Sequence, residues 1–151
     1  MRKKNLEAVG KKKIGNLTKR ELFLVGSALY WAEGSKKDRR TTFVNSDPVM
    51  ILLYIKWLRE CLEVKVEDIY CHISINQDYQ SRIKKVENYW SRITGISLEN
   101  FRSPSYKKVK NRKFYANFNK HYGSLFVKVK KGTNLNYEIL GYIEGLKNQA
   151  V

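Results

Sequence analysis

Cysteine, proline and long apolar runs are all scarce in this chain of 151 residues. Its two cysteines, Cys61 and Cys71, are too few for a disulfide scaffold, which favours a reducing compartment. No apolar run approaches the roughly 20 residues that a membrane-spanning helix needs, and the first residues show no apolar signal core. We therefore expect a cytoplasmic protein, not secreted and without a membrane partner.

Acidic residues are missing from one continuous stretch of 37 residues, 101–137, which holds ten Lys or Arg. The first 20 residues hold eight basic residues and one acid, whereas residues 21–100 hold eleven of each sign. The net charge of +16 is therefore concentrated in an N-terminal arm and one late segment, on either side of a neutral body. Localised positive charge of this kind favours a polyanion, most simply nucleic acid. The alternative is a solvated, lysine-rich surface.

The remaining composition is that of one folded domain. A hydrophobic content of 42% and an aromatic content of 13% exclude a disordered tail, because disordered chains lack such apolar groups. A chain of this length suffices for one hydrophobic core. We predict a basic arm over residues 1–16, flexible or a short helix, and a single domain over residues 17–151.

Two helix starts are well signalled. Thr18 and Glu21 have the spacing of a capping box, and the helix that follows ends at Gly34, which suits a left-handed cap. That helix is apolar nearly all round, which predicts a central position. A second helix begins at Ser46-Asp47-Pro48, where we favour Asp47 as a helix cap over a metal ligand.

The strand pattern predicts an α+β domain with helices packed on one face of a mostly antiparallel sheet. Strands are expected at residues 39–45, 69–75 and 124–130, with a pair at 106–110 and 113–118, and further helices at 78–94 and 135–147. The other face of the sheet then carries polar and basic residues, a surface that suits a DNA duplex because β-structure fits the major groove.

The first helix also carries small residues on one stripe. Val25, Ala28 and Ala32 recur at spacings of three and four, which suits a helix that meets its own copy across a two-fold axis. Glu33 lies at the carboxyl end of this helix, where the helix dipole disfavours a carboxylate. It therefore needs a partner, which is either a neighbouring base (Lys36, Lys37 or Arg39) or a divalent cation.

Residues 26–34 resemble the LAGLIDADG signature that names one family of homing endonucleases. The matching positions are Leu29, Ala32 and Gly34, with small residues kept at Ser27 and Ala28 and a carboxylate, Glu33, in the place of the metal-binding acid. Three positions depart from the signature: Gly26 replaces its leading leucine, Tyr30 an aliphatic residue, and Trp31 stands where the family often has its first acid.

The resemblance implies a LAGLIDADG endonuclease-like fold with a saddle-shaped sheet over DNA, and one motif per chain implies a homodimer. It implies that Glu33 and its symmetry mate hold Mg²⁺ or another divalent cation beside the scissile phosphates, which agrees with the ligand preference of hard cations. It also implies lysines near the site, for which Lys36, Lys128 and Lys130 are candidates. The implied activity is a site-specific double-stranded DNA endonuclease, a metal-dependent hydrolase.

Two other functions stay open. The first is a DNA-binding regulator of the same fold whose nuclease chemistry has lapsed, and the second is a monomeric RNA-binding module. The expected DNA contacts are Lys37, Arg39, Arg40, Lys107, Lys108, Lys110, Arg112, Lys113, Phe126, Lys128 and Lys130.

Other reactive residues are expected to be structural. His72 and His121 have no metal-ligand spacing and are interpreted as surface residues. Both cysteines and the tryptophans Trp31, Trp57 and Trp90 are expected to pack in the core. No phosphate-binding loop or nucleophile motif occurs, so no small-molecule substrate is expected.

Overall fold

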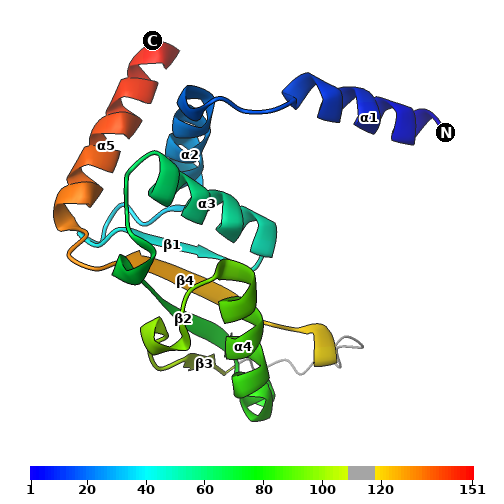
Figure 1. The fold of residues 1–151 in the computed structure, drawn as a ribbon, viewed down its shortest axis with the longest axis vertical. Coiled ribbons are helices and arrows are strands. Elements are labelled where there is room, and N and C mark those ends of the chain that lie inside the picture. Colours follow the sequence, from blue (N-terminus) through cyan, green and yellow to red (C-terminus); the bar gives the residue numbers. More distant parts are fainter. Residues whose placement is uncertain (109–117) are drawn as a thin grey trace.

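The computed structural model describes residues 1–108 and 118–151 and shows an α+β fold (Figure 1). Its helices are α1 (Arg2–Ile14), α2 (Lys19–Glu33), α3 (Pro48–Glu60), α4 (Ile83–Thr94) and α5 (Thr133–Lys147). Its strands are β1 (Thr42–Asn45), β2 (Ile69–Asn76), β3 (Ser105–Lys107) and β4 (Ser124–Val129).

Within the described residues, four strands form one open sheet in the order β1-β4-β2-β3. β4 pairs antiparallel with both β1 and β2, whereas β2 and β3 are parallel. The predicted mostly antiparallel sheet is therefore confirmed. The predicted pairing of 106–110 with 113–118 falls mainly outside the described residues, and its last residue, Phe118, begins a 3₁₀ turn that runs to Lys120.

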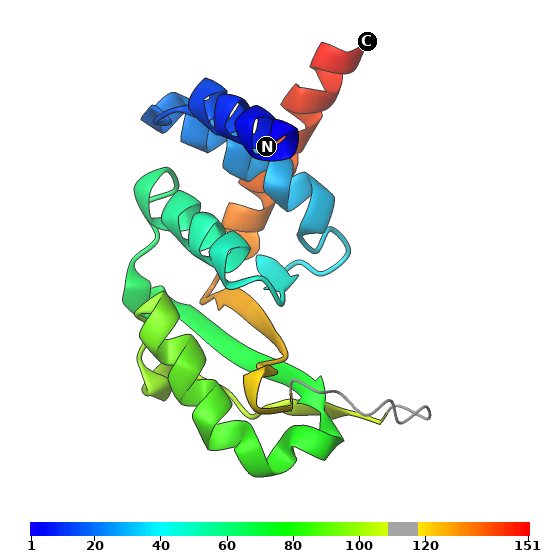
Figure 2. The same ribbon diagram turned by 90° about the vertical axis from the view of Figure 1, so that its right-hand side faces the viewer.

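The two faces of the sheet differ. Helices α3 and α4 lie on one face (Figure 2), and the alternate residues of the strands that point towards them are buried. These buried residues are Ile69, Cys71, Ile73 and Ile75 of β2 and Leu125, Val127 and Val129 of β4. The intervening residues Val44, Tyr70, His72, Phe126 and Lys128 are only half-buried, and we call them the open face.

Alternation along β2 holds except at its end. Ser74 was expected to face outward with Tyr70 and His72, but it is 4% exposed. At this point β2 has a neighbouring strand on each side, since Ser74 lies opposite Ser124 of β4 and Ser105 of β3.

The capping box of α2 is confirmed. The Glu21 N–H donates to Thr18 Oγ1 at 3.1 Å, and the Thr18 N–H donates to Glu21 Oε1 at 2.9 Å. These bonds stabilise the charged carboxylate and lower the pKa of Glu21. The left-handed cap predicted for Gly34 is wrong, since its φ is −76° and its backbone is extended. Glycine is required there because a Cβ would lie 2.6 Å from the Tyr30 ring.

α2 is not buried all round, as its composition suggested. One side packs into the protein through Leu22, Gly26, Ser27 and Tyr30. The other side leaves Leu24 and Val25 39% exposed and Trp31 38% exposed, and Ala28 and Ala32 are exposed as well. Trp57 and Trp90 are fully buried as predicted, whereas the prediction for Trp31 is wrong because it lies on this exposed side.

The contact between α2 and α3 depends on Gly26. A Cβ on Gly26 would lie 2.1 Å from the ring of Trp57, so only glycine allows this indole to pack against α2. Trp57 Nε1 donates to the Phe23 carbonyl at 3.2 Å, and Ser27 Oγ donates to the same carbonyl at 2.7 Å. The departure from the signature at Gly26 therefore has a packing cause.

Other boundaries differ by a few residues. α3 begins as predicted, with Asp47 Oδ1 accepting from the Val49 N–H at 2.9 Å. The strand predicted from residue 39 starts only at Thr42. The first turn of the predicted helix 78–94 is a 3₁₀ segment, Gln77–Arg82, whose start is capped by the Asn76 side chain.

Helix α1 stands apart from the rest of the chain (Figure 1) and has no buried residue. The arm predicted for residues 1–16 is thus mostly helical, with three lysines in its last turn. None of the helices within residues 1–108 and 118–151 is both long and apolar enough to cross a membrane.

Candidate nucleic-acid interface

The open face centres on a short row of side chains from three strands. Phe126 lies opposite Val44 of β1 and His72 of β2, while Lys128 lies opposite Tyr70. The rings of Phe126 and His72 stack with their centroids 4.2 Å apart and an angle of 18° between their planes. Lys128 Nζ lies 6.0 Å from the Phe126 centroid, so a cation borders a flat aromatic surface.

Burial and the nearby Lys128 ammonium both lower the pKa of His72, because each disfavours a second positive charge. His72 is therefore a neutral ring that adds to the aromatic surface. His72 and His121 were predicted to be ordinary surface residues, but each packs against an aromatic ring. The His121 ring lies 4.5 Å from that of Tyr79, measured between centroids.

Arg102 extends the open face and was not singled out from the sequence. Its guanidinium carbon lies 5.2 Å from the centroid of the Tyr70 ring. The backbone N–H of Arg102 donates to the Cys71 carbonyl at 2.7 Å, which fixes this segment beside β2. The only signal in the sequence is its place in the acid-free stretch.

Glu33 is the last residue of α2 and is exposed. It makes no hydrogen bond or ion pair with residues 1–108 or 118–151. Lys36 was one of the possible partners, but its Nζ donates to the carbonyls of Trp31 at 2.8 Å and Gly34 at 3.2 Å. A cation at this helix end is favoured by the dipole, so Lys36 caps α2 and leaves the Glu33 carboxylate available.

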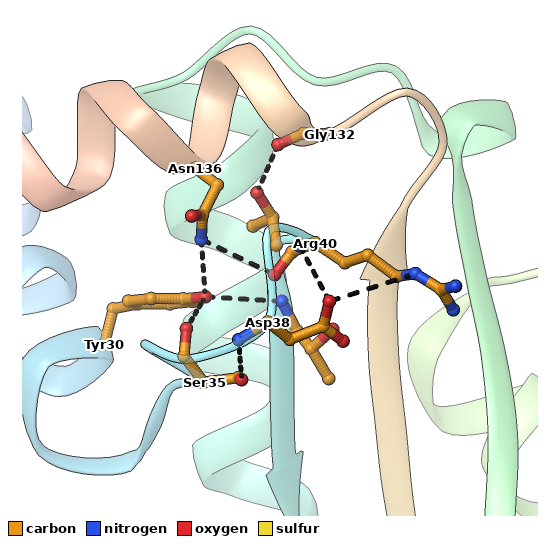
Figure 3. Close-up of polar contacts among 8 residues, drawn as sticks. Tyr30, Ser35, Asp38, Arg40, Gly132 and Asn136 are labelled. Atoms are coloured by element: carbon orange, nitrogen blue, oxygen red, sulfur yellow. Dashed lines mark hydrogen bonds and ion pairs between the residues drawn. The ribbon is translucent and has the colours of Figure 1, made fainter.

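The loop after Glu33 is fixed by the buried Tyr30 hydroxyl (Figure 3). Tyr30 Oη donates to the Ser35 carbonyl at 2.7 Å and accepts from the Thr42 N–H and from Asn136 Nδ2, both at 3.3 Å. Burial raises the pKa of Tyr30, which keeps the hydroxyl proton in place. This network joins α2, β1 and α5, and it accounts for Tyr30 where the signature has an aliphatic residue.

This loop also carries three exposed basic residues besides Lys36, together with one acid, Asp38. Lys37 and Arg39 lie in it without a bond to the described residues, while Arg40 Nε lies 3.9 Å from Asp38 Oδ1. The loop therefore presents positive charge close to the end of α2, as the DNA-contact prediction requires.

The Lys130 ammonium is held by bonds to the body of the protein. Its Nζ donates to the Glu67 carbonyl at 2.8 Å and to Asn100 Oδ1 at 3.1 Å, so the ammonium is held just after the end of β4. Lys107 and Lys108 are exposed at and after β3. The other predicted contacts, Lys110, Arg112 and Lys113, lie outside the described residues.

Whether one chain alone could hold a metal ion depends on how its ligand side chains are grouped. Over residues 1–108 and 118–151, no three His, Cys, Asp or Glu side chains gather in a way that would hold a metal ion. Asp47 caps α3, in agreement with the structural role predicted for it. Burial raises the pKa of the Cys71 thiol to about 12, so it stays protonated in the core, whereas Cys61 is only half-buried.

Comparison with protein-family models, with curated proteins and with solved structures finds no match to this chain.

Proposed function

We propose that this protein binds double-stranded DNA through the open face of its sheet. The observation that carries the proposal is the row of Lys128, Phe126 and His72, which places a cation and a flat aromatic surface on a sheet face opposite the helices. The acid-free stretch contributes two of these three residues, so no carboxylate of that stretch opposes the phosphates. Phosphate contacts supply affinity and position, whereas side chains on the sheet contact base edges.

The exposed side of α2 supports a homodimer in this proposal. Val25, Ala28 and Ala32 lie on it, flanked by the larger Leu24 and Trp31. An apolar helix face with small residues at its centre allows close approach of a second copy. The two-fold axis would then run beside α2, and a palindromic or near-palindromic DNA site would match it.

Substitution on α2 tests the dimer. Val25→Arg places a charge on the exposed apolar side, and the variant should sediment as a monomer at concentrations where the wild type is a dimer. Leu52→Arg is the matched control, because Leu52 of α3 is 40% exposed, like Val25, but lies on another helix. A wild type that is monomeric at all concentrations and prefers structured RNA would favour the RNA-binding alternative.

The activity we propose is divalent-metal-dependent cleavage of both DNA strands. Glu33 could act as a metal ligand, because it is exposed and has no partner among the described residues. It supplies only one carboxylate per chain. Hard cations such as Mg²⁺ accept one or two carboxylates with phosphate oxygens, so two copies of Glu33 and the DNA would complete the ligand set. The bound metal would activate water and stabilise charge on the phosphate oxygens. Lys36, through its bonds to α2, positions the end of the helix.

Incubation with a DNA library and Mg²⁺ tests the activity directly. The wild type should release cut ends, and Glu33→Gln should keep duplex binding and lose cutting, because the amide does not carry the charge that attracts the metal. Glu60→Gln is the control, since Glu60 is also the exposed last residue of a helix, α3. Cutting by Glu33→Gln at the wild-type rate would contradict the assignment.

A DNA-binding regulator without nuclease activity is the second candidate. It is favoured by Trp31, which stands where the signature often has its first acid, and by the single carboxylate at the end of α2. In that case the same assay should give retarded complexes and no cut ends for both the wild type and Glu33→Gln.

A further inference from the structure

A second basic surface lies beyond the open face, at the end of the sheet where β2 ends and β4 begins. Helix α4 and the segment that leads into β4 enclose a cavity of about 460 Å³. Among the described residues, its lining has three cationic side chains, two amides and two phenols, and no carboxylate. These residues are Arg82, Lys85, Asn88, Tyr89, Arg92, Asn119 and Tyr122, and we call this cavity the α4 groove.

The α4 groove is held in shape by bonds between its two walls. The buried Arg82 donates from Nη1 to the His121 carbonyl at 2.6 Å and from Nη2 to the Asn119 carbonyl at 2.7 Å. Trp90 Nε1 donates to the Tyr122 carbonyl at 2.8 Å. The Tyr89 and Tyr122 rings stack with their centroids 3.6 Å apart and nearly parallel. The groove is therefore formed before any ligand arrives.

The chemistry of the lining selects an anion. Positive side chains without a carboxylate repel cations, and the polar lining gives an apolar ligand little to bind. Lys85 and Arg92 are exposed and offer charged donors, to which Asn88 adds an amide on the same side of α4. Arginine, lysine, amide and phenol donors together are the set that contacts phosphate oxygens in protein–DNA complexes.

The position of the groove indicates which phosphates these are. In both views α4 lies at the end of the molecule opposite α2 (Figures 1 and 2). The groove lies directly before β4, the strand that carries Phe126 and Lys128. If the two-fold axis of a dimer runs beside α2, a duplex on the sheet extends from that axis towards α4. The groove would therefore meet the part of the duplex that is farthest from the axis.

We propose that the α4 groove binds the phosphodiester backbone of DNA at the outer end of each half-site. This inference rests on the proposed function, because it needs a duplex on the open face and a dimer about α2. Lys85 and Arg92 contact the phosphate oxygens, and Arg82 positions the second wall. The groove contributes affinity and not sequence preference, since backbone contacts are independent of sequence.

The test compares two double variants that remove the same charge. In Lys85→Ala/Arg92→Ala both groove cations are lost, whereas in Lys65→Ala/Lys84→Ala two exposed lysines that do not line the groove are lost. Fluorescence anisotropy with a long duplex should show about tenfold weaker binding for the groove variant, and a salt dependence of log Kd that is shallower by about two. The control should change both quantities less.

Shortening the duplex sharpens the test. On a duplex trimmed from both ends, the wild type and the groove variant should bind equally, because the outer phosphates are gone from both complexes. Equal binding of the two double variants to the long duplex would overturn the inference while the proposed function stands. A free anion as the ligand would also overturn it. In that case inorganic phosphate would shift the NMR signals of the groove residues in the wild type, while the groove variant would keep the wild-type affinity for the duplex. Failure of the wild type to bind any duplex would instead overturn the proposed function.

Discussion

The two faces of the sheet are built from alternate residues of the same strands, yet they differ in chemistry. On β4, Leu125 and Val127 are fully buried against the helices, whereas the neighbouring Phe126 and Lys128 are half-buried on the open face. The first pair is explained by packing alone. Packing against the helices does not explain the second pair, an aromatic stack beside a lysine on the opposite face. This difference is why we propose that the open face binds DNA.

The largest expected effect is on the buried side. Leu125→Ala should lower the free energy of unfolding by about 2–5 kcal/mol, because it leaves a cavity between the sheet and the helices. Phe126→Ala, one residue along, should cost less, since it loses about 0.5–1.5 kcal/mol of ring stacking and only part of the burial of a core side chain, and it should weaken duplex binding. Chemical denaturation and anisotropy of both variants measure the contrast. Equal stability losses would mean that the two faces are not distinct.

A smaller effect is expected between α2 and α3. Gly26→Ala should lower the free energy of unfolding by about 1–3 kcal/mol, since its Cβ would overlap the Trp57 ring and force the indole to move. Gly141→Ala in α5 is the control, because a Cβ there meets nothing within 4 Å. It should raise stability by about 0.5–1 kcal/mol through helix propensity. Thermal denaturation of the two variants should therefore shift in opposite directions.

On the open face, Lys128→Ala should weaken duplex binding and make the salt dependence of log Kd shallower by about one, with stability changed by less than about 0.5 kcal/mol. Lys56→Ala on α3 removes the same charge from the helix-covered side and is the control. Anisotropy over a range of salt concentrations measures both. The same loss in the two variants would indicate that the binding depends on total charge and not on the open face.

The smallest expected effect is a shift in a titration midpoint. The pKa of His72 should lie below 6.5, its ordinary value, and Lys128→Ala should raise it while leaving His121 unchanged, since His121 is influenced by burial and Arg82 instead. Because the folded chain binds this proton less readily than the unfolded chain, the contribution of His72 to stability is present above about pH 6.5 and declines as the pH falls below it. Titration by NMR measures both midpoints. If the pKa of His72 stayed the same in Lys128→Ala, the Lys128 ammonium would have no influence on this ring, which would contradict the account.

Local signals in the sequence predicted much of the fold. The capping box at Thr18 and the cap at Asp47 involve neighbours in the chain, and period-two alternation placed β2 and β4 with their buried sides correct apart from Ser74. The role of Gly34 was missed because it depends on the approach of the Tyr30 ring and not on a positive φ.

The candidate site was less predictable, because its geometry depends on residues distant in sequence. Lys130 looked equivalent to Lys128 in the alternating pattern, but the carbonyl of Glu67, 63 positions away, holds its ammonium. The α4 groove had no signal, since Arg82 and Tyr122 meet only once α4 packs beside the start of β4. Such contacts are set by tertiary packing.

Photo-crosslinking tests the central claim, that the open face binds DNA, most directly. Benzoyl-phenylalanine replaces one aromatic ring by another at Phe126, and the same group at Leu52 reports on α3, on the other side of the sheet. The account predicts covalent linkage to duplex DNA from position 126 and none from position 52. Linkage from position 52 without linkage from position 126 would contradict it.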